Sequence, residues 1–188
     1  SAATTVTITI TGSNDAPTLT IGDTAGAMTE GNGAATLSDS GALSFADLDS
    51  NDVVTVSQTY NNDIAWNGGT LAAGVASALV AGFSVDQNSW DYSASQNLDF
   101  LRAGETITMS FDVVATDDSG AGNAASAATT VTITITGSND APNIQLVTTD
   151  SAASTLTETN AGLSAAGTLT VTDVDLNDTV ASTVTTLV

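Results

Sequence analysis

The chain has 188 residues and a formal net charge of −20, with one basic residue, Arg102, against 21 acidic ones. Such a charge repels nucleic acids and anionic membranes, so neither is expected as a partner, and no apolar run is long enough for membrane insertion. Hydrophobic residues still make up 41% of the chain and alternate with polar ones, which indicates a folded protein. The acidic charge must therefore be neutralised from outside, and a divalent cation is the simplest agent.

The missing residue types narrow the function further. The chain contains no Cys, His or Lys. Their absence excludes disulfides, thiolate metal sites, a Ser-His triad and a Schiff-base lysine. Paired carboxylates can hydrolyse glycosides, but no arginine clamp or aromatic sugar platform accompanies the acidic pairs here. We therefore predict that the protein is not an enzyme.

A repeat organises the chain. Residues Ser1–Pro17 recur without change as Ser126–Pro142, 125 residues later. An identical copy at that spacing predicts a tandem array of domain-sized units. We expect the last strand of a preceding repeat at 1–13, a complete repeat at 14–137, and a joint with the first half of the next repeat at 138–188.

The predicted elements are mostly short strands. Within the first copy, Val6, Ile8 and Ile10 alternate with threonines, which is typical of a half-buried strand over Thr5–Thr11. Turn residues separate further strands, which are predicted at Thr18–Ile21, Gly41–Ala46, Val53–Thr59, Gly82–Val85, Trp90–Tyr92, Thr106–Ala115 and Thr129–Thr136. Short helices are predicted at Leu71–Val80 and Asn97–Leu101.

This pattern predicts an all-β fold. Many short strands with regular turns are typical of an antiparallel β-sandwich, with Greek-key topology as the default. The aromatic residues expected in its core are Trp66, Phe83, Trp90, Tyr92, Phe100 and Phe111.

An acidic loop occurs twice. The sequence Asp47-Leu-Asp49-Ser-Asn51-Asp52 recurs as Asp173-Val-Asp175-Leu-Asn177-Asp178. The spacing resembles the start of an EF-hand loop, but Asp52 replaces its glycine, and Gln58 and Val184 replace its last glutamate. Asp and Asn also favour plain solvated turns. The recurrence and the net charge favour a cation site, because three carboxylates in six residues repel one another without a cation.

Strand directions bring the acidic groups to the two ends of the sandwich. At the N-terminal end we expect a Ca²⁺ site from Asn14, Asp15, Asp47, Asp49, Asp52, Asp117 and Asp118. At the far end we expect the equivalent site from Glu30, Asn139, Asp140, Asp173, Asp175 and Asp178. Glu158 matches Glu30 in the next repeat, within the same Leu-Thr-Glu context. The sequence therefore predicts calcium between neighbouring repeats, bound by both domains and the linker.

Several motifs resemble one bacterial repeat family. They are Ala-Thr-Asp-Asp-Ser-Gly at 115–120, Thr-Val-Thr-Ile-Thr-Ile-Thr-Gly-Ser-Asn-Asp-Ala-Pro at 130–142, Leu-Arg-Ala-Gly-Glu-Thr-Ile-Thr at 101–108 and Ser-Trp-Asp-Tyr-Ser at 89–93. Together they resemble the VCBS-type, cadherin-like tandem repeats of giant bacterial RTX adhesins. The resemblance implies an immunoglobulin- or cadherin-like sandwich, calcium at the joints, type I secretion, and an extracellular extender role at the cell surface or in the biofilm matrix.

Two alternatives remain open at this stage. Donation of the strand Ser1–Gly12 to another chain would give a self-associating filament by β-augmentation. The repeat is also longer than is usual for the family, with the extra residues expected around Asn61–Val80, where Trp66 and Asn67-Gly68-Gly69 could form a ligand-binding tip. Neighbouring repeats of the same chain are the partners that the leading hypothesis requires.

Overall fold

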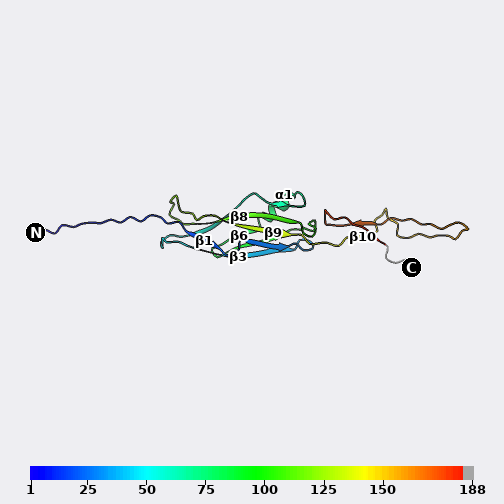
Figure 1. Cartoon of the computed structure of the whole chain (residues 1–188), viewed down its shortest axis with the longest axis horizontal. Coiled ribbons are helices and arrows are strands. Elements are labelled where there is room, and N and C mark those ends of the chain that lie inside the picture. The colour runs from blue at the N-terminus through cyan, green and yellow to red at the C-terminus, as the bar shows by residue number, and fades with distance from the viewer. Residues whose placement is uncertain (184–188) are drawn as a thin grey trace.

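The computed structural model describes residues 1–183, so Val184 and the end of the predicted segment 138–188 lie outside the described residues. Two β-sheets between Thr18 and Thr136 form the layers of a sandwich (Figure 1). One layer has the strand order β1-β3-β7-β6, and the other has the order β2-β9-β8-β4, with β5 also paired to β8. The predicted all-β sandwich is confirmed. The bounds are β1 Thr18–Ile21, β2 Ala25–Thr29, β3 Thr36–Ala46, β4 Thr55–Tyr60, β5 Ala65–Trp66, α1 Ala73–Val80, β6 Phe83–Val85, β7 Ser89–Ser95, β8 Thr106–Thr116 and β9 Thr129–Thr136.

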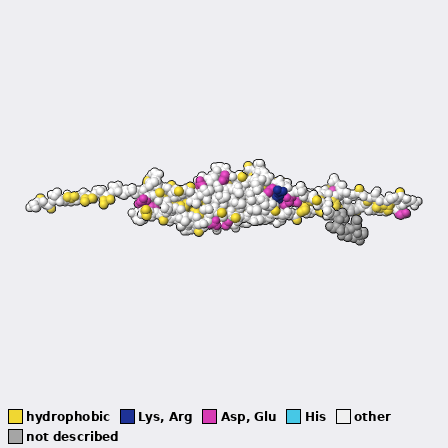
Figure 2. Space-filling model, viewed as in Figure 1, with side chains coloured by type: hydrophobic (Ala, Val, Ile, Leu, Met, Phe, Trp, Pro, Cys, Tyr) yellow, Lys and Arg dark blue, Asp and Glu magenta, His cyan; other side chains and the backbone are white. Residues whose placement is uncertain are grey.

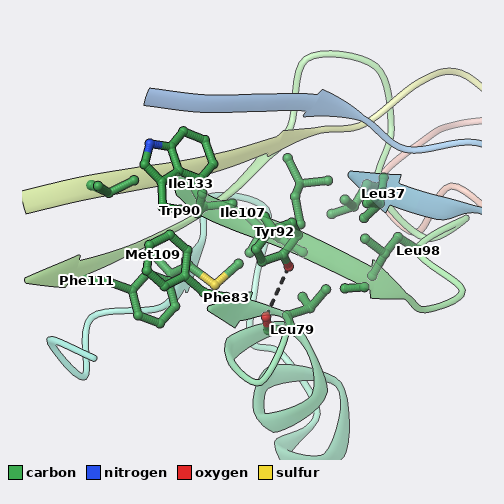
Figure 3. Packing of buried hydrophobic residues seen from close by; sticks show 14 of the residues in the cluster. Leu37, Leu79, Phe83, Trp90, Tyr92, Leu98, Ile107, Met109, Phe111 and Ile133 are labelled. Carbon is green, nitrogen blue, oxygen red and sulfur yellow. Dashed lines mark hydrogen bonds between the residues drawn. The ribbon is translucent and has the colours of Figure 1, made fainter. Parts of the chain in front are cut away.

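The core lies between the two layers and contains most of the predicted aromatic residues (Figure 3). Phe83 of one layer stacks on Phe111 of the other, with ring centroids 4.2 Å apart. The buried polar groups of two other rings find backbone acceptors: Trp90 Nε1 donates to the Asp23 carbonyl at 2.7 Å, and the Tyr92 hydroxyl donates to the Leu79 carbonyl at 3.1 Å. These bonds avoid the cost of burying an unpaired donor.

Three local predictions need correction. Residues Asn97–Leu101 form a turn and not a helix, because the Asn97 side chain accepts a hydrogen bond from the Asp99 amide and competes with helical bonding. Strand β2 was not predicted, since its sequence Ala-Gly-Ala-Met-Thr has little β-propensity. It also pairs in parallel with β9, so the sandwich is not purely antiparallel. The other predicted helix is present as α1.

The two identical copies have different structures. In the second copy, β9 lies between β2 and β8, and Val131, Ile133 and Ile135 are completely buried. In the first copy, no strand is assigned, and Val6, Ile8 and Ile10 are 80%, 82% and 91% exposed. The predicted strand over Thr5–Thr11 is therefore absent from this structure. The alternating pattern supplies an apolar face, but a strand forms only where neighbouring strands complete its hydrogen bonds.

Beyond the sandwich, the chain begins the same pattern again. Strand β10 (Asn143–Gln145) pairs antiparallel with β11 (Thr170–Thr172), and the segment extends away from the sandwich (Figure 1). In the sandwich, Thr18 lies opposite Ala46, and here Asn143 lies opposite Thr172. These pairs occupy matching positions of the repeat, so the register of the first two paired strands recurs.

The close packing of β3 on β7 gives a first testable prediction. A Cβ atom at Gly41 would overlap the Trp90 indole, whose position is fixed in the core. We expect Gly41→Ala to lower the free energy of unfolding by about 1–3 kcal/mol. The matched control is Gly22→Ala, because no atom lies within 4 Å of a Cβ there. Equal denaturation midpoints for the two variants would contradict the proposed packing.

Candidate metal centres at the ends of the sandwich

Three separate segments bring buried acidic residues together where the sandwich meets the C-terminal segment. We call this region the C-terminal joint. Glu30 follows β2, Asp140 follows β9, and Asp175 lies in the acidic loop after β11; they are 4%, 7% and 2% exposed. The Asp140 amide donates to Asp175 Oδ2 at 2.9 Å, which ties the loop to the linker. Glu30 Oε1 accepts bonds from the amide and hydroxyl of Ser138 at 2.9 and 2.7 Å.

Each of these three carboxylates has one oxygen without a partner. Glu30 Oε2, Asp140 Oδ2 and Asp175 Oδ1 are buried and accept no hydrogen bond from the described residues. A buried carboxylate oxygen without a partner is costly, because it has lost its hydration. Three such oxygens from both sides of the joint match the ligand chemistry of a hard divalent cation. The chemistry of these oxygens is therefore of the kind that calcium binds.

Burial and mutual repulsion raise the pKa of two carboxyl groups at the joint. Burial raises the pKa of Asp140 above its ordinary value, and the charges of Asp99, Glu30, Asp175 and Asp173 raise it further. Burial also raises the pKa of Asp175. The hydrogen bond from the Asp140 amide lowers this pKa, and the charges of Asp178, Asp173 and Glu30 raise it further. Ionised carboxylates at this joint are thus held at a cost that a cation would remove.

Sequence reasoning missed two residues of this joint, Asn32 and Asp99. Asp99 Oδ1 accepts a hydrogen bond from the Gly33 amide at 2.6 Å, and its charge acts on Asp140. Asn32 Nδ2 donates to Asp140 Oδ1 at 2.8 Å. The predicted ligand Asn139 is present at the joint, where its Nδ2 donates to the Asp140 carbonyl. Asp99 was missed because a helix was predicted over Asn97–Leu101 and only acidic residues in loops were considered as ligands.

The N-terminal end of the sandwich has a second acidic cluster, formed by the linker, the loop after β3 and the loop after β8. The Asp15 amide donates to Asp49 Oδ2 at 2.7 Å, and Asn14 Nδ2 donates to Asp117 Oδ2 at 3.2 Å. The Val53 amide, next to Asp52, donates to Asp118 Oδ1 at 2.9 Å. These three segments therefore meet at one place, as the strand directions predicted.

The charges at this N-terminal cluster are unbalanced in the same way. Asp47 Oδ1 accepts a hydrogen bond from the Asp49 amide at 2.9 Å, whereas its Oδ2 is buried and has no partner within residues 1–183. Burial raises the pKa of Asp52, followed by the charges of Asp117, Asp49, Asp118 and Asp47. Asp117 differs, because the Ser119 hydroxyl donates to it and lowers its pKa against the effect of burial.

Not every predicted ligand lies at a cluster. Glu158 is exposed in the segment between β10 and β11, away from the sandwich. Asp178 does lie at the C-terminal joint, where its charge raises the pKa of Asp175, but it is only half-buried and its Oδ1 is 3.9 Å from Arg102 Nη1. Within residues 1–183, no group of three or more Asp or Glu side chains is already arranged to hold a metal ion. The unpartnered oxygens would therefore have to move towards a cation as it binds.

Comparison with known proteins found no match, either to a protein-family model or to a curated protein. The resemblance to VCBS-type repeats therefore stays a prediction that rests on the quoted motifs. Within the described residues, no helix has the length and apolar character needed to cross a membrane.

The raised pKa values predict how the C-terminal joint responds to pH. In metal-free protein, Asp140 and Asp175 have folded-state pKa values above the ordinary 3.8, so the folded chain binds their protons more tightly than the unfolded chain does. Their contribution to the free energy of unfolding is therefore complete below pH 3.8, and it is lost as the pH rises through the raised pKa values. We expect the carboxyl ¹³C resonances of Asp140 and Asp175 to titrate above 3.8 in chelator and at lower pH in calcium. Titration of both groups at or below 3.8 in chelator would contradict this electrostatic description.

Proposed function

We propose that this protein is a structural extender whose tandem repeats are made rigid by calcium bound at their joints. The observation that carries the proposal is the set of three buried, unpartnered carboxylate oxygens on Glu30, Asp140 and Asp175. They come from the sandwich, the linker and the next segment, so one ion bound to all three would cross-link adjacent units. The analogous cluster at the N-terminal end would join the sandwich to a preceding repeat.

The net charge supports the same function. Without a cation, 21 acidic residues and one basic residue leave each joint dominated by repulsion between carboxylates. Bound calcium would neutralise that repulsion and convert a flexible string of domains into a rod. Extracellular modules bind calcium with dissociation constants of about 10⁻⁴–10⁻³ M, which suits the millimolar calcium outside cells. Together with the motif resemblance, this supports a secreted bacterial adhesin of the cell surface or biofilm matrix.

Calorimetric titration tests the proposal directly. We expect calcium to bind the metal-free chain, and magnesium to bind less well because it requires a smaller octahedral site and dehydrates reluctantly. At a calcium concentration 100 times the dissociation constant, each site should stabilise the folded chain by about 2.7 kcal/mol, so chelation should lower the unfolding midpoint. A titration without binding heat and a midpoint insensitive to chelator would contradict the proposal.

A second candidate function is assembly into filaments by strand donation. The observation that favours it is the exposed copy at Ser1–Thr11, because the same sequence forms β9 elsewhere in the chain, with the side chains of Val131, Ile133 and Ile135 completely buried. Such a strand could pair with the sheet edge of another chain. Sedimentation velocity distinguishes the two functions: a filament grows with protein concentration, whereas an extender keeps one sedimentation coefficient.

A further inference from the structure

Part of the segment 61–80, where we expect the residues that lengthen the repeat, lies beside the C-terminal joint. Its residues Trp66 and Gly68 form a notch with Phe100, Arg102 and Glu105, and we use the name notch for these five residues. Glu105 is 6% exposed, and its Oε2 accepts a hydrogen bond from Trp66 Nε1 at 3.0 Å. Trp66 also packs edge-to-face on Phe100, with ring centroids 4.9 Å apart. Trp66 Nε1 thus donates its hydrogen bond within the protein, whereas the predicted ligand-binding tip would need it free to bind a ligand.

Gly68 leaves the room in which the Glu105 carboxylate lies. A Cβ atom at Gly68 would overlap the carboxylate of Glu105, so any side chain there would displace it. The second oxygen of Glu105 is thereby held at the edge of the sandwich, facing the segment that follows the linker. Within the sandwich only Arg102 Nε approaches this oxygen, at 3.4 Å, so a nearly buried carboxylate here has room for a closer hydrogen-bond donor.

Asn177 of the next acidic loop supplies that donor. Its Nδ2 donates to Glu105 Oε1 at 2.6 Å and to the Gly68 carbonyl at 3.2 Å. The neighbouring backbone is bound as well, because the Leu176 amide donates to the Phe100 carbonyl at 3.2 Å. These bonds join the sandwich to the acidic loop without any metal.

The single basic residue of the chain lies at the same contact. Arg102 Nε is 3.4 Å from Glu105 Oε1, its Nη1 is 3.9 Å from Asp178 Oδ1, and Nη1 also donates to the Asn177 carbonyl at 3.4 Å. Figure 2 shows this one basic side chain among acidic ones where the sandwich meets the C-terminal segment. Arg102 is half exposed, so these ion pairs contribute little free energy and serve to orient the loop.

The Asn-Asp pair that binds the notch has a counterpart in the first acidic loop. Asn177-Asp178 corresponds to Asn51-Asp52 in the first acidic loop, at the opposite end of the sandwich. Asn51 is exposed, and its side chain makes no hydrogen bond within residues 1–183. The sandwich thus has the notch at one end and an Asn-Asp pair at the other.

We infer that the notch is a metal-independent latch that receives the Asn-Asp pair of the following repeat and fixes the orientation of adjacent domains. The inference rests on the proposed function in one respect, namely that the joint between repeats determines the shape of the chain. Calcium would supply the attraction between the domains, and the latch would set their bend and twist. The partner that Asn51-Asp52 fits is the notch of a preceding copy of this repeat.

Spin labels can measure the orientation, because the chain has no cysteine. Ser84→Cys and Gln145→Cys place one label on the exposed face of β6 and one on β10. In saturating calcium, pulsed dipolar spectroscopy should give a single narrow distance distribution for this labelled protein. Asn177→Ala should lose the narrow peak while calorimetry still detects calcium binding.

Two further variants distinguish loss of the latch from a general disturbance of the fold. Asn160→Ala makes the same substitution at an exposed asparagine between β10 and β11 and should leave the distribution unchanged, whereas Gly68→Ala should broaden it as Asn177→Ala does. A distribution in Asn177→Ala as narrow as that of the parent would overturn the latch. A parent distribution equally narrow in calcium and in chelator would instead contradict the calcium proposal, so the two failures are distinguishable.

Discussion

Asp175→Asn is expected to change the stability of the chain in opposite directions with and without calcium. In chelator, the substitution removes one charge from a buried group of carboxylates and keeps an oxygen for the Asp140 amide. The unfolding midpoint should therefore stay equal or rise. In calcium, the same substitution removes a charged ligand, so the calcium-dependent stabilisation of about 2.7 kcal/mol at 100 times the dissociation constant should be largely lost.

The control for this prediction is Asp91→Asn, which removes one charge from the exposed face of β7, away from both ends of the sandwich. Asp91→Asn should leave the calcium-dependent shift of the midpoint as it is in the parent. Scanning calorimetry of the three proteins in calcium and in chelator gives all the values required. A calcium-dependent shift in Asp175→Asn as large as that of the parent would show that Asp175 is no ligand.

Ile133→Ala is expected to destabilise the protein strongly, while Ile8→Ala has almost no effect. The two residues occupy the same position in identical stretches of 17 residues, but Ile133 is completely buried and Ile8 is 82% exposed. Removing a buried isoleucine side chain costs about 2–5 kcal/mol, because the lost contacts leave a cavity. An exposed substitution changes stability by no more than about 0.5 kcal/mol.

Urea denaturation of the two variants measures this difference without further controls, since each is the control for the other. Ile133→Ala should also lower the thermal midpoint by on the order of 10 °C. Similar losses for both variants would mean that the first copy is packed in solution, for example against a second chain, and would favour the filament.

The contrast between the two copies shows what sequence patterns can predict of this fold. Alternation in β8 and β9 predicted both strands closely, because each has one apolar face against the core. The same alternation was misleading at Thr5–Thr11, where no neighbouring strand is present. Strand β2 is the reverse case, a strand that its sequence does not indicate. Its residues are poor in β-branched types, and it forms a strand because it pairs with β9 through backbone hydrogen bonds.

The candidate site could be predicted as far as strand directions allowed. The two ends of each strand are fixed by topology, so the grouping of Glu30 with Asp140 and Asp175 follows from the order of the strands. Asp99 and most of the notch could not be found this way, because they lie in turns and loops whose positions depend on packing. Glu105 and Asn177 each lie in a motif that the sequence shows, but these motifs are 72 residues apart and neither indicates that the two side chains meet.

The most direct test of calcium-linked joints is a crystal structure of the chain grown in calcium. We expect an ion at the C-terminal joint, bonded by Glu30 Oε2, Asp140 Oδ2 and Asp175 Oδ1 at about 2.3–2.6 Å, the usual length of calcium–oxygen bonds in proteins. Its identity would be verified by anomalous scattering. Ordered acidic side chains at this joint that bind only water in saturating calcium would contradict the central claim.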